Sequence, residues 1–199
     1  MFAKFQNATE KRIMNIKEYF KELSIVILGI LIAFWINNIG MKYQKHSTQK
    51  QVLSAIFNEL NDNQKEIKIT LENLNQLRLN FEKIQNTAIS SDSSKISIKY
   101  TNSNLKSIGY ETAKYTGILK DIDYKLVSGI VECYEFQKST EELETSMKDE
   151  IFVFFKNKKQ DNVNYLILQI SNLIENIKNL DAEQKQLSEE LTAYLDENS

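Results

Sequence analysis

The side chains that could do chemistry in this chain are few and far apart. Its 199 residues include one histidine, His46, and one cysteine, Cys133. A thiolate–imidazole pair or a zinc site needs more such ligands at close spacing, and a single cysteine excludes an intrachain disulfide. Ser128 precedes Gly129 but lacks the G-x-S-x-G context of an activated serine. We therefore expect Cys133 to be an inert thiol on the apolar face of a helix.

Acidic residues and charge balance give no stronger candidate. Glu141, Glu142 and Glu144 lack the Glu-x-x-His partners of carboxylate-bridged metal sites, and no glycine-rich phosphate loop occurs in the sequence. Lysine and arginine total 25 against 27 acidic residues, a net charge of −2, so no basic surface for nucleic acid is expected. These patterns predict a non-catalytic protein with no cofactor, no metal, no evident small-molecule substrate and no nucleic-acid partner.

The composition favours long helices. The chain has no proline and only five glycines, where average usage would give about ten and about fourteen. Because proline and glycine end helices, their scarcity predicts an all-α fold. The glycines fall only within residues 29–40 and 109–129, so two long limbs without glycine flank a jointed middle segment.

A charge-free run of 19 residues, LSIVILGILIAFWINNIGM, extends from Leu23 to Met41. As a helix it would span about 28 Å, close to the thickness of a bilayer core. We interpret it as an uncleaved transmembrane anchor, preceded by an amphipathic segment over residues 1–22 that lies at the membrane surface. The alternatives are a buried core helix and a cleaved signal peptide, although no small-residue cleavage pattern follows the run.

Basic residues on the two sides of this run indicate an orientation. Four precede it and three follow it, which favours a cytoplasmic N-terminus and an extracytoplasmic, periplasmic C-terminal domain in the inner membrane. They are Lys11, Arg12, Lys17 and Lys21 before the run, and Lys42, Lys45 and Lys50 after it. Within the run, Gly29, Ala33 and Asn37 share one helix face. A small-residue face allows close helix approach, so it is a candidate for self-association, although glycine and alanine are also common in such helices.

Two stretches resemble a known family. They are the span with its flank, KELSIVILGILIAFWINN (Lys21–Asn38) followed by QKQVLSAIFNELNDNQKEI, and the later GYETAKYTGILKDIDYKLVSGIVECYEF (Gly109–Phe136). Together they resemble an uncharacterised family of small single-pass membrane proteins, frequent in Bacteroidota, with a GILIA…INN signature. Ile39 stands where that family often has tryptophan. The resemblance implies membrane anchoring and helical character, with no reaction attached.

Heptad patterns predict two long helices after the span. Apolar residues in a strict 3-4 rhythm are typical of coiled coils, although ordinary amphipathic bundle helices would show a similar pattern. The first limb has Leu53, Ile56, Leu60, Asn63, Ile67, Thr70, Leu74, Leu77, Phe81 and Ile84 in this rhythm, and the second has Val163, Leu166, Ile170, Leu173, Ile177, Leu180, Gln184, Leu187, Leu191 and Tyr194.

The limbs are predicted to pair antiparallel as a coiled-coil stalk. Matching their ends places Leu53 opposite Tyr194 and brings Asn63 opposite Gln184, the one amide in each stripe. A paired buried amide would fix the register. Because a two-helix hairpin has a thin core, a further helix from the same chain or another protomer is expected, and a homo-oligomer is predicted.

The predicted organisation has five parts. Residues 1–22 form the amphipathic segment, 23–41 the transmembrane helix, 42–85 the first stalk helix, 86–160 a loop with a small helical head, and 161–199 the second stalk helix. Within 86–160 we expect a Ser-rich loop over 86–104, with 96–100 as an extended piece. Helices are expected over 105–119, over 121–137 with Asp121 as its cap, and from Thr140 to about Lys156.

The head concentrates tyrosine, with five of nine between Tyr100 and Tyr134. Tyrosine is enriched at recognition surfaces, although packing in an aromatic helical core is the more common use. The candidate partner surface comprises Tyr100, Tyr110, Tyr115, Tyr124 and Tyr134. These features favour a membrane-anchored structural or interaction subunit within an oligomer or larger envelope complex. A periplasmic sensor that relays through a partner and a membrane-active effector remain as alternatives.

Overall fold

The computed structural model describes the backbone of residues 2–87, 102–157 and 162–197, and the side chains of 18–86, 102–156 and 162–197. These residues are helical with no strand, so the predicted all-α class is confirmed for the part of the chain described. The chain divides into two compact units, Met1–Thr48 and Gln49–Ser199. The predicted Ser-rich loop and the extended piece near Tyr100 lie almost wholly outside the described residues.

The first unit consists of the N-terminal part of α1 (Phe2–Thr87). The predicted amphipathic segment and the predicted span are both helical there. By length and composition this helix is apolar enough to cross a membrane, and its most apolar window has no residue buried against protein. Large side chains such as Ile25, Phe34 and Trp35 are exposed throughout it. The run is thus not buried in the structure as a core helix would be.

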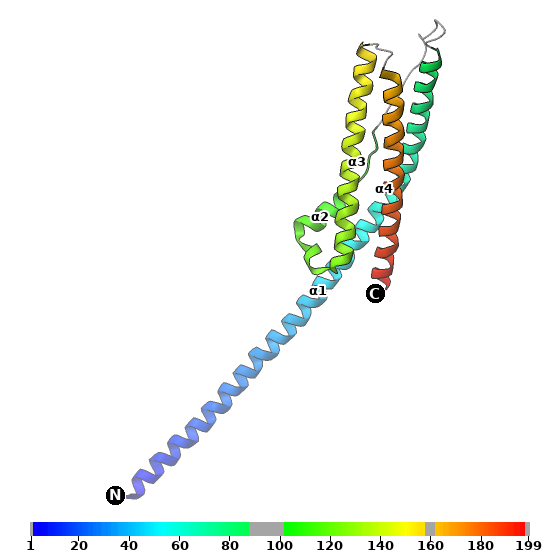
Figure 1. Cartoon of the computed structure of the whole chain (residues 1–199). Coiled ribbons are helices and arrows are strands. Elements are labelled where there is room, and N and C mark those ends of the chain that lie inside the picture. Colours follow the sequence, from blue (N-terminus) through cyan, green and yellow to red (C-terminus); the bar gives the residue numbers. More distant parts are fainter. Residues whose placement is uncertain (1, 88–101, 158–161, 198–199) are drawn as a thin grey trace. The chain divides into compact units, whose positions relative to one another are not determined.

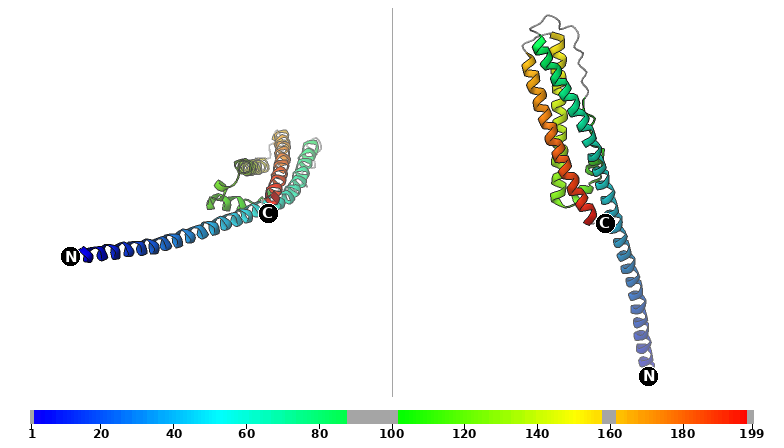
Figure 2. Two further views of the ribbon diagram at one scale, coloured as in Figure 1. Left: turned by 90° about the horizontal axis from the view of Figure 1, so that it is seen from below. Right: turned by 90° about the vertical axis from the view of Figure 1, so that its right-hand side faces the viewer.

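The second unit is a bundle of three long helices. They are the remainder of α1, α3 (Tyr124–Asn157) and α4 (Val163–Glu197), with the short α2 (Ile108–Thr116) and the 3-10 turn η1 (Ile118–Asp121) between α1 and α3. Figure 1 shows α3 rising in the same direction as α1 and α4 returning in the opposite direction. The right-hand view of Figure 2 shows the same three helices side by side.

The heptad positions of both limbs face the bundle core. Nine positions of the first limb, Leu53 to Phe81, and nine of the second, Val163 to Leu191, are buried, and the last position of each limb is half-buried. Gln64 Nε2 donates to Ser188 Oγ at 3.4 Å, and Gln85 donates to Asn164. Residue numbers thus increase along α1 while those of the contacted residues on α4 decrease, as in an antiparallel pair.

The middle segment differs from the predicted head. The two helices expected over 121–137 and from Thr140 to Lys156 are one continuous helix, α3, which packs along both limbs as the third helix of the bundle. Its buried stripe has the same 3-4 rhythm as the limbs. The stripe comprises Leu126, Ile130, Cys133, Gln137, Thr140, Glu144, Met147, Ile151 and Phe154. Because three consecutive members, Gln137, Thr140 and Glu144, are polar, a search for apolar residues does not detect this rhythm.

The ends of α2 and α3 follow from local chemistry. Gly117 has φ 68° and accepts the left-handed conformation that ends α2. The carboxylate of Asp123 accepts the backbone N–H of Lys125 at 2.9 Å and that of Leu126 at 3.4 Å. Asp123 is thus the cap of α3, and the prediction of Asp121 was wrong, because Asp121 lies in η1, before the turn that leads into the helix.

Candidate interaction surface

The predicted self-association face lies in the first unit. Gly29, Ala33 and Asn37 are all exposed on α1, and a Cβ added at Gly29 would meet nothing within 4 Å. The Asn37 side-chain amide contacts Met41 Sδ at 3.6 Å within the same helix. Nothing in this unit covers the face, so it stays a prediction.

The predicted register pair meets in the bundle core through a third amide. Gln137 Oε1 accepts the side-chain N–H of Asn63 at 3.2 Å and that of Gln184 at 3.1 Å. One amide from each long helix therefore forms a buried polar layer. The heptad pattern of the two limbs predicts two members of this layer but not Gln137. An i, i+7 continuation from Ile130 would have placed Gln137 in the α3 stripe.

The polar layer also holds the extended chain that leads to α2. Asn63 donates to the Lys106 carbonyl at 2.8 Å and accepts the Lys106 N–H at 2.7 Å, so its amide pairs with the backbone at both ends. Further along, Glu144 Oε2 accepts the N–H of Ser103 at 3.1 Å and its hydroxyl at 2.6 Å. These bonds satisfy backbone groups of an extended segment that has no strand partner.

The five candidate tyrosines separate into three groups. Tyr110 and Tyr134 are buried and stack with ring centroids 4.5 Å apart, and the Tyr134 hydroxyl donates to Glu59 at 2.6 Å. They belong to the core, so placing them on a partner surface was wrong. Tyr115 and Tyr124 are 87% and 83% exposed. Tyr100 lies outside the described residues.

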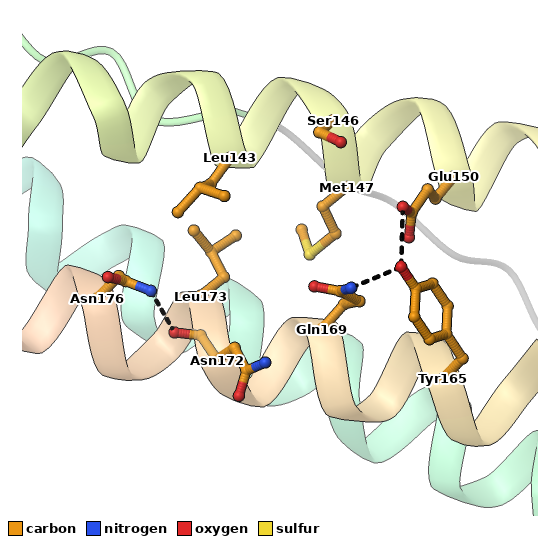
Figure 3. A pocket seen from close by; sticks show the side chains of 9 residues that line it. All are labelled: Leu143, Ser146, Met147, Glu150, Tyr165, Gln169, Asn172, Leu173 and Asn176. Atoms are coloured by element: carbon orange, nitrogen blue, oxygen red, sulfur yellow. Dashed lines mark hydrogen bonds between the residues drawn. The ribbon is translucent and has the colours of Figure 1, made fainter.

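A groove lies between α3 and α4 (Figure 3). It has a volume of about 370 Å³, with Met147 and Leu173 as its buried floor and Leu143 and Tyr165 exposed at its edges. The Tyr165 hydroxyl donates to Glu150 at 3.4 Å and accepts the Gln169 amide at 2.7 Å. A second hollow of about 350 Å³ continues from it along Val153. The groove therefore combines apolar contact area with amide and hydroxyl groups.

No family model, curated protein or solved structure matches this chain.

The titratable groups of the bundle are governed by burial. Burial raises the pKa of the Cys133 thiol to about 12, with the nearby Glu183 carboxylate adding to the effect. Cys133 is therefore protonated and unreactive in the folded bundle. Burial also raises the pKa of Glu144, and the bonds from Ser103 oppose the rise only in part. Among the described residues, no group of three or more histidine, cysteine or acidic side chains is placed to hold a metal ion.

Proposed function

We propose that this chain is a membrane-anchored, non-catalytic interaction subunit. The observation that carries the proposal is the contrast between the two apolar patterns of α1. The heptad stripe from Leu53 to Phe81 is buried in the bundle, whereas none of the most apolar window of α1 is buried. A run of that length and apolarity is suited to the hydrocarbon core of a bilayer, which supports the anchor.

The same proposal places the bundle outside the cytoplasm. The lysine and arginine excess on the N-terminal side of the span supports an orientation with the N-terminus inside. The resemblance of Lys21–Asn38 to the single-pass Bacteroidota family supports the anchor in the inner membrane. The heptad stripes support a coiled-coil stalk that is built from the two antiparallel limbs, with α3 as its third helix.

The partner we propose for the α3–α4 groove is a second copy of the chain. Copies anchored through the same segment would present their grooves at the same height above the membrane. The Gly29–Ala33 face would let two spans approach closely. A groove between two long helices is suited to a further helix that completes a larger bundle. The exposed side chains that line the groove and its continuation, Leu143, Val153 and Tyr165, would be covered in such an assembly.

Carbonate extraction of membranes tests the anchor, and reporter proteins fused to the C-terminus test its orientation. Full-length protein in bacterial membranes should resist extraction by alkaline carbonate. Alkaline phosphatase fused after Ser199 should be active, and a fluorescent protein fused there should be dark. Extraction by carbonate would overturn the anchor, and the opposite reporter pattern would overturn the orientation.

The groove is tested by photo-cross-linking from two sites on one helix. Ser146 lines the groove, whereas Lys148 is exposed on another side of α3 at nearly the same level. A photoreactive residue at position 146 of the membrane-embedded chain should give a cross-linked dimer, and one at 148 should not. Equal yields at both positions, or cross-links from 146 to a different protein alone, would overturn self-association through the groove.

A further inference from the structure

The end of the bundle formed by η1 and the start of α3 has features of a lipid-contacting surface. Gln49, the first residue of the second unit, donates its side-chain N–H to the backbone carbonyl of Asp121 at 2.8 Å. The η1 turn is therefore held at the level at which α1 enters the bundle. In the neighbouring η1 turn, Ile118 and Leu119 are partly buried and pack against the core cluster that contains Leu53.

The chain limits how far this end can be from the bilayer. Gln49 follows Met41, the last residue of the apolar run, by only eight positions along the chain. They reach about 12 Å as a helix, and even a fully extended chain reaches only about 28 Å. Whatever the tilt of the bundle, its η1 end remains within that tether of the membrane interface.

The side chains exposed at this end are those that favour a membrane interface. Tyr124 is the first residue of α3, and because helical side chains tilt toward the N-terminus, its ring is directed toward this end. Tyr115 lies on the outward face of α2. Ile108, two turns earlier on the same helix, is 74% exposed. Amphipathic rings of this kind concentrate at the level of lipid headgroups.

Charges of both signs accompany the tyrosines. Lys114, Lys120 and Lys125 are exposed there, and their long side chains can reach phosphates while their methylene groups follow the apolar surface. Glu111, Asp121 and Asp123 balance them, so the surface has no net charge. A neutral surface with exposed rings is suited to zwitterionic headgroups and does not require anionic lipid.

We propose that the α2–η1–α3 corner, comprising Tyr115, Lys120 and Tyr124, rests on the phospholipid headgroups next to the span. The proposal rests on the membrane anchor proposed above. It assigns the exposed tyrosines to lipid and leaves the α3–α4 groove free for a protein. Contact at this corner would restrict the tilt of the bundle and so fix the height and direction in which the groove is presented.

The test measures the distance of single sites from headgroups in the full chain. Lys120→Cys is labelled with an environment-sensitive fluorophore and reconstituted in phosphatidylcholine vesicles that contain a headgroup nitroxide lipid. The same label at Asp149→Cys, exposed far along α3, is the matched control. Cys133 is buried, so we expect it not to be labelled in the folded protein. We expect loss of most of the emission at position 120 and little loss at 149, because about 40 Å of helix separates the two levels.

A second comparison separates contact from tethering alone. Adding Tyr115→Ser and Tyr124→Ser to the Lys120→Cys chain should clearly reduce the quenching at position 120, while Cys133 stays unreactive as evidence of folding. Protein that floats with the vesicles but shows equal quenching at 120 and 149, or no effect of the serines, overturns the lipid contact and leaves the anchor intact. Protein that does not float with the vesicles overturns the anchor itself.

Discussion

The buried amide layer predicts that two substitutions together will be less harmful than one of them alone. Gln137 Oε1 is the acceptor for both Asn63 and Gln184. Gln137→Leu leaves Asn63 its two bonds to the Lys106 backbone. It leaves Gln184, which is 0% exposed, with no partner for its amide N–H among the described residues. An orphaned buried amide costs about 1–3 kcal/mol.

Further losses add to this cost. Gln137 Nε2 also donates to the Lys106 carbonyl at 3.2 Å and to Glu141 at 3.0 Å. Each such bond contributes about 0.5–1.5 kcal/mol, so Gln137→Leu should lower the free energy of unfolding by about 2–6 kcal/mol in total. Adding Gln184→Leu removes the orphaned amide and places two apolar side chains in contact. The double variant should regain about 1–3 kcal/mol relative to Gln137→Leu.

Cys133 provides a measurement specific to the bundle. It is the only cysteine, is 3% exposed, and lies in the α3 stripe. Brief maleimide labelling of the full chain in detergent, across a urea series, therefore follows the opening of the bundle and is insensitive to the span. Gln186→Leu, at an exposed site on α4, is the matched control and should change stability by less than about 0.5 kcal/mol. If the double variant opens at lower urea than Gln137→Leu, the shared-acceptor reasoning is refuted.

Three other predictions use the same chain. Asp123→Ala should cost about 1 kcal/mol by removing the α3 cap, whereas Asp149→Ala, exposed within α3, should be nearly neutral in the same labelling assay; equal effects would count against the cap. Gly117→Ala should destabilise the bundle by about 1 kcal/mol because the φ of Gly117 is 68°. Gly129→Ala should stabilise it by about 0.5–1 kcal/mol, because Gly129 lies inside a helix and its new Cβ would be 3.7 Å from its nearest neighbours. Changes of the same sign in the free energy of unfolding would disprove this. Burial raises the pKa of Glu144 above the ordinary 4.5, so in the pH range between these two pKa values the folded chain keeps a proton that the unfolded chain has released. Stability should therefore fall as pH rises through that range. Burial raises the pKa of Glu141 and Glu183 as well, while the lysines beside exposed Asp62 lower its pKa. The urea midpoint of unfolding, measured by circular dichroism, should therefore be higher at pH 5 than at pH 7. Glu144→Gln should reduce this difference between the two midpoints, and an unchanged difference would contradict the prediction.

The limbs were predictable because their pattern is local and complete. A 3-4 repeat over ten positions fixes which face of a helix is buried, and every position predicted for the two limbs is buried or half-buried. The third helix was not predictable in the same way. In α3 the core positions Gln137, Thr140 and Glu144 are polar, so the apolar rhythm stops for three positions and suggests two short helices. Gln137 and Glu144 have partners on α1, at Ser103 and at Lys106, which are distant in sequence, whereas Thr140 donates to the Phe136 carbonyl of its own helix.

The surface assignments failed for a related reason. Composition located the tyrosines in the correct segment but could not separate stacked core rings from exposed ones. Tyr110 and Tyr134 are core residues because Glu59 on α1 accepts the Tyr134 hydroxyl and the N–H of Gly109. A glutamate in the apolar half of a limb is the only sign of this in the sequence, and it lies 75 residues from Tyr134.

The polar residues of α3 have a structural consequence that apolar ones would not have. Two limbs with one amide each would leave Asn63 and Gln184 to satisfy each other, and an apolar third helix could then slide between registers at little cost. Gln137 can meet both amides at one level only, and one heptad further along the stripe Glu144 meets Ser103. Moving α3 by a heptad would orphan several buried polar groups at once, at about 1–3 kcal/mol each. The residues that hide α3 from the sequence are therefore the ones that fix its position, and with it the alignment of the α3–α4 groove.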